Sequence, residues 1–366
     1  MAVARHRIPA RHTARPWVLL LAGLFAGLLA ACERTPPPPT APATTQAVFF
    51  SFGTLVSVEL WGTSPELGRQ ALAAIEGDLD YMHFAWHAWK PGSLGRVNQL
   101  LATGAWFTAN PSVLPLVKRA HALWRRSGGL FNPAMGELLA LWGFQSDAPP
   151  QGPPPSAEAI AAWLANAPRP EDLEMDGLRL RSRNPRLRLD LGGIAKGYAL
   201  AQIADNLRDM GVPAAILNAG GDLYAWGRPG ERPWRIGIRH PRRTGIIATL
   251  DIRGAEAVFT SGDYERYVEH AGRRYPHILD PRTGYPAEGV QAVTVIHADP
   301  TLADAAATAL YVAGVKDWPR AALAMGVREV LLIDAQGRLY LTPEMRQRLR
   351  FVPGAPTPVV VSLPAS

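Results

Sequence analysis

Short apolar segments alternate with helical ones from residue 187 onward, and glycine pairs stand at several of the joints. Glycine lacks a Cβ, so it lets the backbone turn sharply or approach a ligand closely. This alternation predicts a single α+β domain with a largely antiparallel sheet and packed helices. The expected strands are 187–191, 214–218, 234–239, 246–252 and 292–297, and the expected helices are 194–210, ended by Gly211, and 302–312, ended by Gly314.

The first third of the chain has the same mixed character. Alternating apolar and polar residues predict one strand over 47–60, and Ser64 followed by Pro65 is typical of a helix start. Apolar residues at helical spacing then predict two helices. The first contains Leu72, Ile75, Leu79 and Met82, and the second contains Val113, Val117, Ala120 and Trp124 and ends at Gly128 and Gly129.

Residues 1–31 are predicted to be a targeting segment. Four arginines precede the apolar run 17–29, whose 13 residues fall short of the roughly 20 that cross a bilayer. The run ends at Leu-Ala-Ala-Cys, the pattern of a bacterial lipoprotein cleavage box, and Cys32 is the only cysteine of the chain. We therefore expect lipidation at Cys32 and a location in the bacterial cell envelope, anchored to the inner or outer membrane and facing the periplasm.

The region that follows the targeting segment predicts the domain organisation. Residues 32–46 include four consecutive prolines and few apolar side chains, so they are expected to form an extended linker. Residues 47–350 are then expected to form one domain, and 351–366 a C-terminal tail.

The charge of the chain argues against a nucleic-acid partner. The formal net charge is +7, but without the four arginines of the targeting segment 34 basic residues face 31 acidic ones, a net of +3. No basic run or stripe interleaved with aromatic residues is present.

Asp304 and Thr308 are the first candidate site residues. Four residues apart at an apparent helix start, they share one helical face and present two hard oxygens to one point, which suits magnesium better than zinc or copper. The alternative is that Asp304, in the opening turn, only complements the helix dipole.

A second candidate site is the segment 190–198, where a strand end passes through Gly192 and Gly193 into a helix. The free N–H groups of a helix start can bind a phosphate, and Lys196 could add a positive charge. The glycine spacing fits neither a Walker loop nor a dinucleotide fingerprint. A tight packing turn would explain the same residues.

Three further segments combine glycine with polar side chains: 218–222, 260–264 and 277–284. The first is a strand that runs into a glycine turn and then a carboxylate. The residues 280–284 have the composition of a simple tight turn, and an isolated histidine such as His277 is by default structural.

Taken in order, these segments resemble the FAD:protein FMN transferase family, also called the ApbE family, over about residues 50–348. The matching landmarks are Gly53 with Thr54, 90–93 with Asn98, 131–133 with 142–144, 190–198, 218–222, 260–262, 277–284 and 303–308. The resemblance implies a T-fold-like flavin transferase architecture.

The resemblance also implies a reaction. A magnesium ion would bridge the pyrophosphate of FAD, held by the main-chain carbonyl of Gly193 and the side chains of Asp304 and Thr308. A threonine or serine hydroxyl of an acceptor flavoprotein, a subunit of a redox complex, would attack the phosphorus on the riboflavin side, and AMP would leave. His277, which ordinarily titrates near neutral pH, would serve as the base, although an acidic residue near the metal could do so instead.

The same resemblance implies a set of FAD contacts, with Trp89 packing on the flavin ring. The residues implied to bind FAD are Thr54, Trp89, Asp190, Lys196, Asn218, Gly220, Gly221, Asp222, Thr260, Ser261, Gly262, His277, Asp280, Arg282 and Thr283.

Two alternatives to transfer remain open from the sequence. The same metal site could hydrolyse FAD to FMN and AMP, with water replacing the hydroxyl. A non-catalytic lipoprotein that binds and delivers FAD is the other alternative.

Overall fold

A computed structural model describes residues 44–146 and 152–365. The predicted targeting segment, Cys32 and most of the predicted linker lie outside these residues. Among the described residues, no helix is both long enough and apolar enough to span a bilayer.

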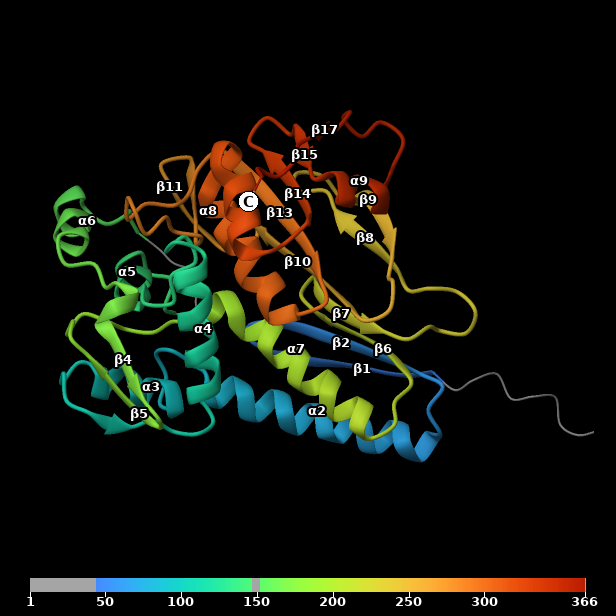
Figure 1. Ribbon diagram of the computed structural model, residues 1–366, viewed down its shortest axis with the longest axis horizontal. Helices are drawn as coiled ribbons and strands as arrows, with labels where there is room; N and C mark the ends of the chain where they lie inside the picture. Colours follow the sequence, from blue (N-terminus) through green and yellow to red (C-terminus); the bar gives the residue numbers. More distant parts are fainter. Residues whose placement is uncertain (1–43, 147–151, 366) are drawn as a thin grey trace, which may run out of the picture. The chain divides into compact units, whose positions relative to one another are not determined.

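A nine-stranded sheet forms the centre of the fold (Figure 1). Every neighbouring pair of its strands is antiparallel except the last pair, β15 and β17. This confirms the predicted α+β class. In spatial order the strands are β1 (Thr44–Ser51), β2 (Thr54–Trp61), β6 (Ala214–Ala219), β7 (Asp222–Trp226), β10 (Glu256–Gly262), β13 (Val290–His297), β14 (Glu329–Asp334), β15 (Leu339–Leu341) and β17 (Val359–Val360).

Three small sheets and a set of helices complete the described fold. The small sheets consist of β16 (Arg350–Phe351), β9 (Ile246–Asp251) and β8 (Arg235–Arg239); β3 (Phe107–Thr108), β5 (Arg179–Ser182) and β4 (Leu173–Asp176); and β11 (Tyr267–His270) with β12 (Arg273–Pro276). The helices are α2 (Pro65–Ala85), α3 (Ser93–Leu101), α4 (Leu114–Arg126), α5 (Gly136–Leu141), α6 (Ala157–Leu164), α7 (Gly192–Asp209), α8 (Pro300–Met325) and α9 (Pro343–Arg348), with a 3₁₀ turn at Pro170–Asp172.

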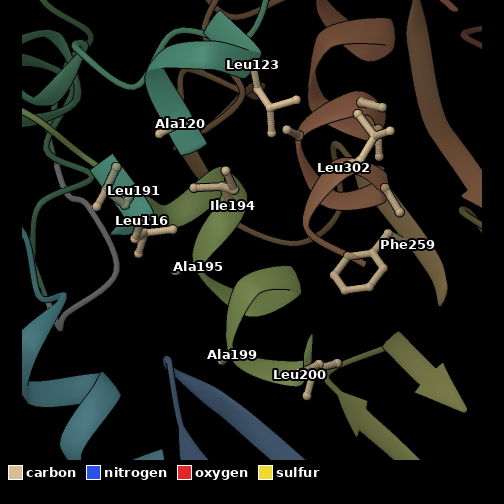
Figure 2. Close-up of a cluster of buried hydrophobic side chains, with 14 of the residues drawn as sticks. Leu116, Ala120, Leu123, Leu191, Ile194, Ala195, Ala199, Leu200, Phe259 and Leu302 are labelled. Atoms are coloured by element: carbon tan, nitrogen blue, oxygen red, sulfur yellow. The ribbon is translucent and has the colours of Figure 1, made fainter. Parts of the chain in front are cut away.

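The N-terminal half of α7 lies at the centre of the main apolar core. Figure 2 shows Ile194 and Leu200 of α7 among buried side chains from three other elements. Leu123 comes from α4, Phe259 from β10 and Leu302 from α8. Burial of this many apolar side chains is the main stabilising term, and it fixes α7 against both α4 and α8.

Helices α7 and α8 are in close contact at Gly197. A Cβ on this glycine would lie 2.3 Å from the main-chain oxygen of Pro300 and 2.9 Å from the Cβ of Asp304. No real side chain fits in that space, so the contact requires glycine. The N–H of Gly197 donates a 2.8 Å hydrogen bond to the Oδ2 of Asp304, which ties the two helices together at the same point.

Three sequence expectations for the secondary structure were wrong in detail. The single strand expected over 47–60 is a hairpin of β1 and β2, whose turn residues Phe52 and Gly53 have φ values of 50° and 71°. Two positive φ values are the mark of the two-residue type I′ turn, and the apolar alternation continues across it. The N–H of Phe52 donates to the Nδ1 of His83 at 3.2 Å, which helps to hold a bulky residue in this conformation.

Helix α8 differs from the expectation at both ends. Its N-cap is Asp299, whose carboxylate accepts from the N–H groups of Thr301 and Leu302, so Asp304 lies in the second turn and not in the first. Gly314 breaks the helical geometry, with φ 72° and ψ 178°, but the helix resumes after it and ends at Met325.

The segment 187–191 forms no strand, and the pattern also missed several elements. Residue Arg188 makes only an isolated bridge to Met135. Helix α6 follows the proline-rich stretch after Ser156. At the two ends of the domain, β1 begins at Thr44, before the expected bound of 47, and β17 pairs with β15 inside the expected tail.

We predict that Gly197→Ala destabilises the protein by about 1–3 kcal/mol, because the new methyl group must push α8 away from α7. Gly77→Ala is the matched control: it is also inside a helix, and a Cβ there would have nothing within 4 Å. It should leave the stability unchanged or raise it by about 0.5–1 kcal/mol. Urea unfolding of the two variants measures the difference, and equal stabilities would show that the helix crossing can relax.

Candidate functional site

Two tight turns lie side by side at one end of the large sheet. The turn between β6 and β7 contains Gly220, whose N–H donates to the main-chain oxygen of Leu55 at 3.0 Å. A Cβ on Gly220 would lie 2.4 Å from the Oγ1 of Thr54, and its φ is 69°. The N–H of Gly221 donates to the Oδ1 of Asn218 at 2.8 Å. The structure thus brings together Thr54 and the glycine turn, which are distant in sequence.

Asp222, the first residue of β7, connects this turn to α7 and β10. Its buried carboxylate forms an ion pair with the Nζ of Lys196 through Oδ2. Its Oδ1 accepts a hydrogen bond from the N–H of Thr260 at 2.9 Å. The hydroxyl of Thr260 lies 2.9 Å from that of Thr294 on β13.

Asp304, Thr308, Ser261 and Gly193 lie beside the Lys196–Asp222 pair. The Oγ1 of Thr308 is 3.2 Å from the Oγ of Ser261, and a Cβ on Gly193 would lie 3.4 Å from the same Oγ1. In a regular helix the N–H of Gly197 donates a hydrogen bond to the carbonyl of Gly193. Because the carboxylate of Asp304 also accepts from this N–H, Asp304 and the carbonyl of Gly193 lie next to the same donor.

The charges of this cluster are unbalanced. Burial works against the charged form of Lys196, but Asp222 and Asp304 outweigh it and raise the pKa of the ammonium above its usual range. Burial raises the pKa of Asp304 well above its usual range; Lys196 opposes the shift and Asp222 adds to it. Partial burial likewise raises the pKa of Glu265, with Lys196 opposing and Asp222 adding. Three carboxyl groups therefore lie around Lys196, with Arg239 as a further positive charge near Glu265, and such a carboxyl-rich environment favours an added cation.

The chemistry of the donors fits magnesium. Within the described residues, no group of three or more histidine, cysteine, aspartate or glutamate side chains could hold a metal ion. The available donors at Asp304, Thr308 and the carbonyl of Gly193 are all hard oxygens, which Mg²⁺ prefers, and Mg²⁺ typically completes its shell with water and substrate phosphates. Such a site could hold an ion together with a bound pyrophosphate.

His277 faces the same cluster from the loop after β12. Its ring Nδ1 lies 3.1 Å from the main-chain oxygen of Arg266. If Nδ1 carries the proton of this contact, Nε2 is left as an acceptor. Burial lowers the pKa of His277 to about 4, the contact with Arg266 opposes this shift, and the positive charge of Lys196 adds to it. The pKa thus lies below the ordinary value near neutrality, and the imidazole is neutral at physiological pH.

Asp280, Arg282 and Thr283 make contacts that stabilise the loop itself. The carboxylate of Asp280 accepts from the guanidinium of Arg282 at 2.7–3.2 Å. Arg282 also donates to the main-chain oxygen of Val312 on α8 at 3.0 Å, and Thr283 accepts from the N–H of Tyr285. The structure thus supports the simpler turn interpretation of these residues, and their contact with FAD stays a prediction.

Trp89 belongs to a chain of aromatic rings that leads toward Lys196. It is partly exposed and meets the ring of His87 edge-on, with centroids 4.4 Å apart. The rings of His83, Phe52, Trp86 and Tyr198 continue the chain, and Tyr198 stands two residues after Lys196 on α7. The predicted flavin-stacking residue is therefore connected to the site through ring contacts.

Asp190 and Gly262 have local partners. Asp190 accepts from the N–H of Gly192 at 3.0 Å and from the side chain of Gln145 at 3.2 Å. A Cβ on Gly262 would lie 2.6 Å from the ring of Tyr264, so this glycine allows the ring to pack against the strand.

Sequence reasoning missed Glu265 and Gln145. Glu265 stands three residues after the predicted segment 260–262, and this proximity was the only signal for it. Gln145 directly follows the predicted landmark 142–144.

Comparison with known proteins assigns the family. The model of the ApbE family matches residues 52–331. An FAD:protein FMN transferase of Rhodobacter capsulatus is 45% identical over 328 residues, which cover 89% of this chain and 62% of that protein. This chain therefore spans less than two thirds of that relative's length. An FAD:protein FMN transferase of Klebsiella pneumoniae (strain 342) is 35% identical over 253 residues, or 67% of this chain and 76% of that protein.

Solved structures of similar proteins share the fold. The ApbE protein of Thermotoga maritima has a TM-score of 0.77 and 32% identity, with 84% of this chain and 100% of that chain covered. The flavin transferase ApbE from Vibrio cholerae has a TM-score of 0.74 and 27% identity, with 84% and 99% covered. Because the family model extends over most of the sequence and includes the segments that form the site, the chain belongs to the ApbE family.

Proposed function

We propose that this protein is a magnesium-dependent FAD:protein FMN transferase that attaches FMN through a phosphoester bond to a threonine or serine of an acceptor flavoprotein and releases AMP. One observation carries the proposal: Gly193, Thr308 and the buried Asp304 meet where α7 crosses α8, beside the Lys196–Asp222 ion pair. The names of the relatives support the same reaction.

The residues of the site have distinct roles in this proposal. Gly193, Asp304 and Thr308 would hold the ion, which when bound neutralises charge on the pyrophosphate. Lys196 would bind a phosphate oxygen and exchange part of its contact with Asp222 for it. Thr54 and the glycine turn at Gly220 would line the substrate, and the partly exposed Trp89 would offer a flat face to the flavin ring.

His277 would take the proton from the incoming hydroxyl. A neutral imidazole with its Nδ1 held by a main-chain oxygen presents Nε2 as a base. Its low pKa makes it a weaker base than an ordinary histidine, but keeps it unprotonated over the whole physiological range.

We also propose that Cys32 anchors the protein in the bacterial envelope, with the described domain on the periplasmic side and the acceptor in a redox complex. The lipoprotein box at the end of the apolar run supports this location.

Asp304→Asn should abolish magnesium-dependent transfer and preserve the fold. The amide oxygen can still accept from Gly197, and removal of a costly buried charge should leave the Tm without metal equal or higher at pH 8. Magnesium should raise the Tm of the parent but not that of the variant. Asp205→Asn, at an exposed position on α7, is the control and should respond to magnesium like the parent. A magnesium-dependent Tm rise in Asp304→Asn would remove Asp304 from the metal site.

His277→Ala should slow FMN transfer by on the order of 10²–10⁴ and bind FAD nearly as well as the parent, as expected for loss of a positioned base. His270→Ala, at an exposed position on β11, should match the parent in both measurements. Single-turnover transfer and FAD titration separate the roles: a loss of binding in proportion to the rate would contradict the assignment of His277 as base.

The pH dependence of stability gives an independent check on the same residue. The pKa of about 4 in the folded state lies below the ordinary value of about 6.5, so the unfolded state binds more protons between these values. The neutral imidazole therefore stabilises the fold above about pH 6.5, and this contribution is lost as the pH falls toward 4. As the pH is lowered from about 6.5 to about 4, the free energy of unfolding of the parent should decrease relative to that of His277→Gln.

Cys32→Ala should leave an uncleaved precursor in the bacterium, because the lipoprotein peptidase requires a lipidated cysteine. Metabolic labelling with a radioactive fatty acid should mark the parent and not the variant. Processing of the variant at the same site would contradict the lipoprotein assignment.

A further inference from the structure

We propose that Arg266 is the positioning residue for His277: its main-chain oxygen orients the imidazole, and its guanidinium fixes that oxygen to the segment 142–146. The inference rests on the proposed function in one respect, because it takes His277 as the base of the transfer. Arg266 lies between β10 and β11 and is exposed, so its side chain is not part of the apolar core.

The main-chain oxygen of Arg266 contacts His277 at two points. It accepts a 3.0 Å hydrogen bond from the N–H of His277, one step beyond the last pair of the β11–β12 ladder, Tyr267 with Pro276. The ring Nδ1 of His277 lies 3.1 Å from the same oxygen. A carbonyl oxygen can only accept, so a hydrogen bond here requires the proton on Nδ1 and leaves Nε2 as the acceptor. The direction of the ring therefore depends on where the backbone of Arg266 lies.

The guanidinium of Arg266 holds this backbone in place. It donates to the main-chain oxygens of Phe144 at 2.9 Å and of Ser146 at 3.4 Å. The ring of Phe144 is buried and meets the imidazole of His277 edge-on, with the ring centroids 6.2 Å apart. Arg266 thus restrains His277 twice, once through its own carbonyl group and once through the aromatic ring that packs against the imidazole.

The segment 142–146 also holds the far end of the loop 277–284. The indole N–H of Trp142 donates to the main-chain oxygen of Gly284 at 2.9 Å. The loop is thus attached to one segment at both of its ends, directly at one end and through Arg266 at the other. Loss of the Arg266 contacts would free only the end that carries the imidazole.

Gln145 connects the same segment to the start of α7. Its side chain donates to one carboxylate oxygen of Asp190 at 3.2 Å, and the other oxygen accepts from the N–H of Gly192 at 3.0 Å. The next residue is Gly193, whose carbonyl is the proposed metal ligand. Hydrogen bonds therefore link the proposed base to the proposed metal site through Arg266 and this segment.

The guanidinium also acts on the imidazole through its charge. Burial is the largest cause of the lowered pKa of His277; the hydrogen bond to the oxygen of Arg266 opposes it, and the positive charges of Arg266 and Lys196 lower the pKa further. Removal of the charge of Arg266 should therefore raise the pKa of His277 from about 4 toward 6.5. This pKa reports whether the guanidinium lies beside the ring.

The test is Arg266→Met, because methionine keeps an unbranched apolar stem and removes the charge and the donors. The probe is the flavin-free acceptor domain of a redox-complex flavoprotein, and FMN attachment in a single turnover is followed by mass. We expect transfer at saturating FAD to slow roughly ten- to a hundred-fold, because a displaced base loses its alignment with the incoming hydroxyl. The affinity for FAD should equal that of the parent. Arg266→Lys keeps the charge and one reaching donor group, so it should recover part of the rate.

The His277→Ala background separates positioning from any other role of Arg266. If Arg266 acts through His277, Arg266→Met should cause no further loss of rate in that background. An equal loss in both backgrounds would overturn the inference, as would an unchanged rate in Arg266→Met alone. A fall in FAD affinity in proportion to the rate would also overturn it, since Arg266 would then be a ligand of the FAD phosphates. Arg266→Lys undergoes the same comparisons if the methionine variant unfolds.

The matched control is Arg126→Met. The guanidinium of Arg126 likewise joins two segments through a main-chain oxygen, that of Ala324 at 3.0 Å. The control removes the same kind of contact at a distance from the imidazole. It should therefore leave both the transfer rate and the pKa of His277 unchanged.

An NMR titration of the histidine rings tests the positioning without any turnover, with the His277 signal assigned by its absence from His277→Gln. We expect a pKa of about 4 in the parent and in Arg126→Met, and a higher value in Arg266→Met. An unchanged pKa in Arg266→Met would overturn the inference. A parent that transfers no FMN would overturn the proposed function alone, and the titration would then decide by itself whether Arg266 positions His277.

Discussion

The close approach of α7 and α8 at Gly197 determines the geometry of the candidate site. One helix brings Gly193 and Lys196, and the other brings Asp304 and Thr308. A hydrogen bond from the N–H of Gly197 to Asp304 fixes the spacing between them at the point where no side chain could fit. The large apolar core around the first half of α7 then makes this arrangement rigid. The relative positions of these four residues are therefore set by the packing of two helices.

Electrostatics explains why this packed arrangement suits phosphoryl transfer. Buried carboxylates are costly unless a positive charge balances them. Here Lys196 is the positive charge that interacts with Asp222, Asp304 and Glu265. The folded protein thus favours the binding of an additional cation at the position where a bound pyrophosphate would need one. His277 contributes nothing to this negative charge, because it is neutral, and it approaches the cluster from a separate loop. In the proposed function, metal binding and proton transfer would therefore depend on different parts of the chain.

The sequence predicted the fold class and the long helices, because these depend on local patterns, and it named Lys196, Asp222, Asp304 and Thr308, which the structure brings together. Helix α2 begins after Ser64 as expected from its cap, and glycine turns such as 220–221 occur where strands end. Contacts between distant segments could not be read in this way. The pairing of Asp222 with Lys196 and the attachment of Arg282 to Val312 each require knowledge of the packing. The turn at Phe52 was hidden because the apolar alternation of β1 continues into β2, and the low pKa of His277 follows from burial, which no motif encodes.

The β1–β2 hairpin also has a mechanical consequence. The chain enters the domain at Thr44, which pairs with Trp61, while the turn beside the site lies at the other end of the ladder, about 25 Å away for eight residues of strand. A pull on the chain before Thr44 acts along β1 and loads the hydrogen bonds between β1 and β2 in shear, so that they resist together and do not open one by one. The glycine turn that carries Asp222 is joined to β2 and not to β1. Tension from the N-terminal side would therefore act on β1, the outermost strand of the sheet among the described residues, and the candidate site would be shielded from it.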